Sequence, residues 1–213
     1  MRRKKILLIT LCAALILAVA VVGTIAYLTH KTEVVNNTFT IGKIIDNPEN
    51  FVLKEHKATD DDKDGVYVLG VEEVLTNAYT VLPGVDLPKD PFVQVKEEKL
   101  QLDAYVFIEV VDKTGTSVSF TVDTNKWIDL DKKGPNTGKV YAYKDIAQAD
   151  AEFGPVEILK KNSNEKQITV ANDPITDAAA QFGGDVTFYG YMIQAGGFET
   201  AEEAWEAGFA PQN

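Results

Sequence analysis

The chain has 213 residues and is acidic, with 21 Lys and Arg against 32 Asp and Glu and a formal net charge of −11. Both arginines and two lysines stand at the extreme N-terminus, so the remaining chain carries 17 Lys against 32 acids, a net charge of −15. Without guanidinium groups it lacks the bidentate phosphate and guanine contacts favoured in nucleic-acid recognition, which argues against a nucleic-acid partner. A single cysteine, Cys12, excludes an intrachain disulfide, and 45% apolar residues are a globular value.

The first predicted element is an export signal or a membrane anchor. After the basic residues Arg2 to Lys5, a run of 23 uncharged residues extends from Ile6 to Leu28. The small residues Thr24 and Ala26 stand at positions that a signal peptidase reads, so we predict a signal peptide over residues 1–26. The run is also long enough to span a bilayer, and an uncleaved anchor is the alternative. We expect contact with a membrane only through this uncleaved segment.

Period-two alternation of Val, Ile, Phe and Tyr recurs along the rest of the chain and predicts strands. The stretch "AYVFIEVV" is apolar on both faces except for Glu109, which places this strand inside a sheet. Short polar turns separate the segments, so we predict an all-β, antiparallel, jelly-roll-like sandwich in one domain, residues 46–213. The predicted strands are Thr38–Ile45, Val66–Val71, Phe92–Val95, Ala104–Val111, Val118–Val122, Lys139–Tyr143, Val156–Leu159, Gln167–Val170 and Val186–Ile193.

Two short helices are predicted near the C-terminus. In "NDPITDAAAQFGG", Asp173 can cap the helix, Pro174 suits its first position and Gly183 can close its end. In "ETAEEAWEAGF", Thr200 and Glu203 form a capping box, and the following glycine is expected to end the helix. Both helices are too short to change the fold class.

The acidic stretch "TDDDKDG" is a candidate cation site. Three aspartates in alternate positions, followed by glycine, match the first half of a calcium-binding loop. The second half does not match, because the twelfth position holds Val71 instead of a glutamate. A solvated acidic turn is the favoured interpretation, and calcium is the alternative. The residues are Asp60, Asp62, Asp64 and Gly65.

Signatures of hydrolytic chemistry are missing from the sequence. After removal of the signal the histidines are His30 and His56, no H-E-x-x-H motif occurs, and no serine stands in a G-x-S-x-G setting. No cysteine remains to act as a nucleophile. The residues therefore predict neither an enzyme nor a zinc site, and no cofactor apart from the calcium considered above.

Several longer stretches resemble one family. With them the chain resembles, over nearly its whole length, the exported TasA/camelysin proteins of Gram-positive bacteria, whose signal is cut by a dedicated SipW-type signal peptidase. The resemblance implies a secreted jelly-roll subunit, in the extracellular matrix or at the cell surface, that assembles with its own copies into biofilm-matrix fibres. The stretches are "GTIAYLTHKTEVVNNTFTIGK", "LPGVDLPKDPFVQV", "DAYVFIEVV", the region Trp127–Lys144 and "FYGYMIQAGGFETAEEAW".

The resemblance also implies donor-strand exchange, in which the N-terminal segment of one subunit joins the sheet of the next. Cleavage after Ala26 would then free residues 27–45 to pair with an exposed sheet edge. Phe39, Ile41 and Ile44 are the side chains expected to fill the partner's groove. The same alternation would suit the first strand of the chain's own sheet, so both interpretations stay open.

Two other functions are kept as alternatives. Camelysin was named for a metalloprotease activity, so the resemblance raises a secreted or surface metallopeptidase that uses His30 or His56. A calcium-modulated surface adhesin would use Asp60, Asp62 and Asp64. The sequence does not distinguish a main fibre subunit from an accessory one.

Overall fold

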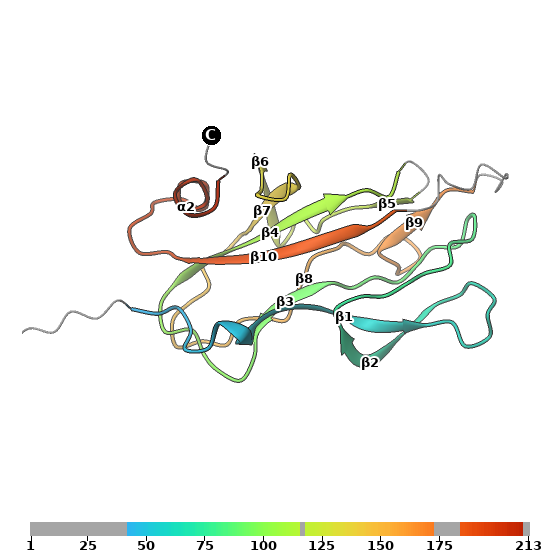
Figure 1. Ribbon diagram of the computed structural model, residues 1–213, viewed down its shortest axis with the longest axis horizontal. Coiled ribbons are helices and arrows are strands. Elements are labelled where there is room, and N and C mark those ends of the chain that lie inside the picture. Colours follow the sequence, from blue (N-terminus) through green and yellow to red (C-terminus); the bar gives the residue numbers. More distant parts are fainter. Residues whose placement is uncertain (1–41, 116–117, 173–183, 211–213) are drawn as a thin grey trace, which may run out of the picture. The chain divides into compact units, whose positions relative to one another are not determined.

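A computed structural model describes residues 42–115, 118–172 and 184–210. In these residues the chain is an antiparallel β protein with a short α-helix (Figure 1). The prediction of an all-β antiparallel sandwich is confirmed, whereas the predicted signal peptide and the predicted helix that begins at Asp173 lie outside the described residues. The elements are η1 Pro48–Asn50, β1 Phe51–Thr59, β2 Val68–Val74, β3 Phe92–Val95, β4 Ala104–Asp112, β5 Val118–Phe120, β6 Trp127–Lys133, β7 Lys139–Tyr143, β8 Val156–Glu157, β9 Ile168–Val170, β10 Val186–Gln194 and α2 Ala201–Gly208.

Two four-stranded sheets form the sandwich. Their strand orders are β2-β1-β3-β8 and β10-β4-β7-β6, and β5 pairs with β9 in a small third sheet. Every neighbouring pair is antiparallel. Figure 1 shows β10 and β4 together in one layer, next to the layer that holds β3 and β1. The strand β4 lies between β10 and β7, inside its sheet, as its two apolar faces predicted.

Alternate side chains of the β10-β4-β7-β6 sheet enter two different cores. On β4, Val106 and Ile108 belong to the main core between the two sheets. Phe107, between them, points to the opposite face and belongs to a smaller core that also contains Trp205 of α2. The ring centroid of Trp205 lies 5.2 Å from that of Phe107 and 5.3 Å from that of Tyr191. Successive side chains of a strand point to opposite faces of the sheet. One face of this sheet therefore forms the core of the sandwich, and the other face packs against α2.

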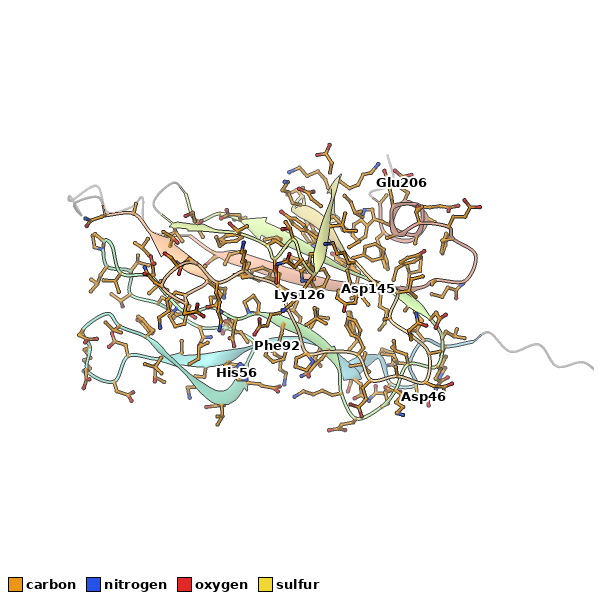
Figure 2. The ribbon with its side chains drawn as sticks, turned by 180° about the vertical axis from the view of Figure 1, so that it is seen from behind. Asp46, His56, Phe92, Lys126, Asp145 and Glu206 are labelled. Carbon is orange, nitrogen blue, oxygen red and sulfur yellow. The ribbon has the colours of Figure 1, made fainter. Side chains whose placement is uncertain are left out.

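The helix α2 begins at the predicted capping box. The Thr200 hydroxyl accepts a hydrogen bond of 3.1 Å from the Glu203 backbone N–H, and the helix ends at Gly208. The Glu203 carboxylate accepts a hydrogen bond of 2.9 Å from the backbone N–H of Glu199. In a capping box the expected donor is the backbone N–H of the N-cap residue, here Thr200. Lys132 of β6 pairs with Glu202 and with Glu206, which is labelled in Figure 2, so the helix is also tied to the sheet. The capping hydrogen bonds and the ion pairs with Lys132 explain why so short a helix is stable.

Two strands were not predicted, and both carry runs of charged residues. In β1 the polar run Lys54–Lys57 hides the alternation, and in β6 the register with β7 shifts between Asp129 and Lys132. The strand β2 also starts later than predicted, because the Tyr67 ring is buried against Tyr79 with centroids 5.0 Å apart. Tertiary contacts thus override local pattern at these three places.

Candidate functional site

Residues of β1, of β10 and of the loop after β2 line a groove of about 530 Å³. The two strands approach closely at Gly190, where an added Cβ would lie 3.3 Å from the Phe51 ring. A groove of this volume has room for several side chains, which is the size range of binding pockets. Its lining is largely apolar and includes Leu53, Leu75, Tyr79, Val81, Leu87, Pro91, Val118, Ile168, Val186 and Phe188.

The groove lies beside two strand edges that no strand of the described residues covers. Among the described residues, β10 is the outermost strand of its sheet. In the part of the chain that the structure describes, residues 51–54 of β1 pair only with β3, because β2 pairs with β1 from Glu55 onward. Free edges present unpaired backbone N–H and C=O groups to an incoming extended segment. The site therefore combines apolar side-chain space with backbone hydrogen-bonding capacity.

A buried ion pair interrupts the apolar lining. Lys89 Nζ donates to Glu55 Oε2 over 2.6 Å, and these side chains are only 11% and 5% exposed. The ammonium also lies 5.9 Å from the ring centroid of Phe188 on β10. The Lys89 backbone N–H donates to Gln167 Oε1 over 3.0 Å, which fixes the loop that carries it. The pair therefore lies between the two edges, in contact with both β1 and β10.

Tyr79 adds a hydroxyl to the same groove. Its O–H donates to the backbone C=O of Pro88 over 2.7 Å. Burial raises the pKa of Tyr79 far above its usual value, and the nearby carboxylates of Glu55 and Asp90 raise it further. The hydroxyl therefore stays protonated well above neutral pH and acts as a donor that positions the loop before Lys89.

The structure places only part of the predicted donor segment. Phe39 and Ile41 lie outside the described residues, whereas Ile44 packs against the chain's own main core and Ile45 is buried in it. The backbone N–H of Gln101 donates to the C=O of Ile44 over 2.8 Å. Residues 42–45 form no strand. Ile44 thus packs in the core of its own chain instead of being left for a partner's groove, and of the three predicted donor side chains Phe39 and Ile41 stay a prediction.

The acidic stretch forms a turn held by its own backbone. Asp60 accepts hydrogen bonds from the backbone N–H groups of Asp64 and Gly65 at 3.1 and 2.9 Å. Gly65 has a φ of +80°, the left-handed conformation that favours glycine. Asp62 is exposed. Within the described part of the chain, no group of three or more His, Cys, Asp and Glu residues is arranged to hold a metal ion, so the calcium alternative gains no supporting observation.

His56 pairs with a single carboxylate. Its Nδ1 lies 2.6 Å from Asp90 Oδ2, and its backbone N–H donates to Asp90 Oδ1 over 3.0 Å. Figure 2 labels His56 and Phe92, whose ring centroids are 5.3 Å apart. These contacts tie β1 to the loop before β3, and they give the peptidase alternative no further ligand. His30 lies outside the described residues.

A second polar site, which the sequence did not predict, is the carboxylate of Glu109 in β4, which is fully buried. Its Oε1 accepts from the backbone N–H groups of Asn136 and Gly138 at 2.9 and 2.8 Å. Its Oε2 accepts from the Tyr191 hydroxyl at 2.7 Å and from Asn136 Nδ2 at 3.0 Å. The sequence signal that could have indicated this site was a single acidic residue in an otherwise apolar strand. Since four donors already engage the carboxylate, the site holds the β6–β7 turn on the sheet.

The edge strand β2 carries exposed apolar side chains. Val71 is 96% exposed and Leu75, just after the strand, is 79% exposed. The β1–β2 register shifts between His56 and Ala58, so Val71 stands at an irregularity that interrupts the ladder. Such irregularities limit continuous pairing along an edge. Of these two residues only Leu75 lines the groove.

The described residues form an antiparallel β-sandwich with a largely apolar groove beside strand edges that no described strand covers. No family model matches the chain, and no curated protein or solved structure is significantly similar to it. Across residues 42–115, 118–172 and 184–210, no helix is long and apolar enough to cross a membrane.

Proposed function

We propose that this protein is a secreted structural subunit whose copies assemble into extracellular matrix fibres. In this proposal the N-terminal segment of one copy lies as a strand in the groove of the next. The observation that carries the proposal is the apolar groove beside the free edges of β1 and β10. Added strands gain affinity from main-chain hydrogen bonds and specificity from pockets for alternate side chains, and the groove offers both.

The proposed donor segment is residues 27–41. Phe39 and Ile41 are two residues apart, so in an extended chain both point to one face. At about 3.3 Å per residue the segment can reach about 50 Å, more than the length of a strand such as β10. Because Ile44 and Ile45 are anchored in their own core, the segment would leave each subunit at Gly42.

The predicted leader supports the same proposal. An uncut segment stays attached to a long apolar run, and a SipW-type signal peptidase cutting after Ala26 would release it for assembly outside the cell. The sequence resemblance to the TasA/camelysin proteins points to the same function. The metallopeptidase and calcium-adhesin alternatives lack a comparable site among the described residues.

Two single substitutions test whether the groove is the assembly site. A chain that begins at Tyr27 should form filaments visible by electron microscopy. Leu75→Asp, which puts a charge at the mouth of the groove, should raise the concentration needed for assembly about hundredfold, because the carboxylate would be buried without a partner. Sedimentation of the filaments measures this concentration.

The matched control is Val71→Asp. Val71 is also an exposed apolar residue of the same hairpin, but it does not line the groove, so this change should shift the assembly concentration less than about threefold. Equal losses in the two variants would place the assembly contact on the β2 edge. A chain from Tyr27 that stays monomeric at every concentration would contradict the proposed function itself.

A further inference from the structure

The Glu55–Lys89 pair is the polar feature of the groove that a donated strand must accommodate. Both side chains line the groove and are nearly buried. In the described residues Lys89 Nζ donates to Glu55 Oε2, while Glu55 Oε1 accepts no hydrogen bond and the ammonium has donors to spare. A polar side chain of an incoming strand could use this remaining hydrogen-bonding capacity.

An apolar strand lying over this pair would be unfavourable. The strand would remove water from a carboxylate and an ammonium without replacing the lost hydrogen bonds. The incoming segment therefore needs, at this one point, an uncharged side chain that both donates and accepts. Elsewhere the apolar lining favours apolar side chains.

The donor segment has such a residue at one position of its inward face. With Phe39 and Ile41 facing the groove, alternation brings Val35 and Asn37 to the same face. The inward residues from Val35 to Ile41 are then Val35, Asn37, Phe39 and Ile41, and among these four Asn37 is the polar one. Its carboxamide NH₂ can donate to Glu55 Oε1 and its C=O can accept from Lys89 Nζ.

We infer that Asn37 of one copy hydrogen-bonds the Glu55–Lys89 pair of the next copy and thereby fixes the register of the donated strand. The inference rests on the proposed function. A slip by two residues keeps the same face inward, so apolar side chains alone specify the register weakly. Such a slip would bring Val35 or Phe39 onto the ion pair, and the buried charges would penalise it. Fixing register is the best-attested use of a buried polar group in an apolar contact.

The sequence offers a matched pair of substitutions, because Asn36 and Asn37 are identical neighbours on opposite faces. In the chain from Tyr27, Asn37→Leu should raise the concentration needed for assembly about tenfold or more, whereas Asn36→Leu should change it less than about threefold. Neither residue belongs to the described fold, so both variants should keep its melting temperature. Equal effects of the two changes would overturn the inference.

A double-mutant cycle tests the contact directly. Replacing the pair with Glu55→Leu and Lys89→Met should weaken assembly with the native segment. Adding Asn37→Leu should restore assembly to within about threefold of the unaltered chain, because both surfaces are then apolar. Additive losses would overturn the inference, and circular dichroism checks that the altered groove folds. If the altered groove does not fold, the comparison of Asn36→Leu with Asn37→Leu decides whether the inference holds.

The outcomes separate the two proposals. If the chain from Tyr27 assembles, Leu75→Asp blocks assembly and Asn37→Leu behaves like Asn36→Leu, then only the role of Asn37 is wrong. If the chain does not assemble, the proposed function fails and this inference fails with it.

Discussion

A chain that begins at Gly42 should remain monomeric at concentrations at which the chain from Tyr27 forms filaments. The shorter chain keeps Ile44, Ile45 and the whole described fold, so its melting temperature should change little. It lacks the segment that would occupy the groove of a neighbour. Analytical ultracentrifugation and electron microscopy of the two chains measure the difference. We expect filaments from the chain that begins at Tyr27 and none from the chain that begins at Gly42.

Two controls make this deletion specific. The full segment with Phe39→Ser and Ile41→Ser should fail to assemble like the deletion, because it keeps the backbone but loses the inward apolar side chains. A synthetic peptide of residues 27–41 should bind one to one to the chain from Gly42. Filaments of unchanged shape from the chain that begins at Gly42 would contradict strand donation.

Replacing Glu109 with alanine should lower the free energy of unfolding by about 3 kcal/mol, because four donors lose their acceptor inside the protein. The backbone N–H groups of Asn136 and Gly138 would have no replacement partner within the turn. An added Cβ at Gly138 would lie 2.8 Å from Glu109 Cγ, so the turn is fitted closely to this side chain. Urea denaturation followed by tryptophan fluorescence measures the loss.

The conservative variant Glu109→Gln is the control. Its carbonyl oxygen can still accept from both backbone N–H groups, so we expect a loss of about 1 kcal/mol. The burial of Tyr191 and its bond to Glu109 raise the pKa of that tyrosine, so its hydroxyl remains a donor well above neutral pH. Equal stability of the alanine variant and the unaltered protein would show that the network does not hold the turn.

The strands with clean alternation were predictable. Phe92–Val95 and Lys139–Tyr143 match the predicted ranges at both ends, and the interior position of β4 followed from its two apolar faces. The start of α2 followed from Thr200 and Glu203. In each of these elements local preference and tertiary packing agree, which is why pattern alone was sufficient.

The walls of the groove were not predictable from pattern. The strand β1 carries Glu55 and His56 in its middle, and these residues are tolerated there because Lys89 and Asp90, far along the chain, supply partners. No local signal indicates that two such segments meet. The same limit applies to Ile44, whose alternation suits donation and self-packing equally, and only the fold places it in its own core.

We propose that a neighbouring copy fills the groove between β1 and β10. Electron cryomicroscopy of filaments grown from the chain that begins at Tyr27 tests it most directly. We expect an added strand beside β10, contributed by residues 27–41 of the adjacent subunit, with Phe39 and Ile41 pointing into the groove. A groove left empty in the filament, or filled by the subunit's own residues 27–41, would contradict it.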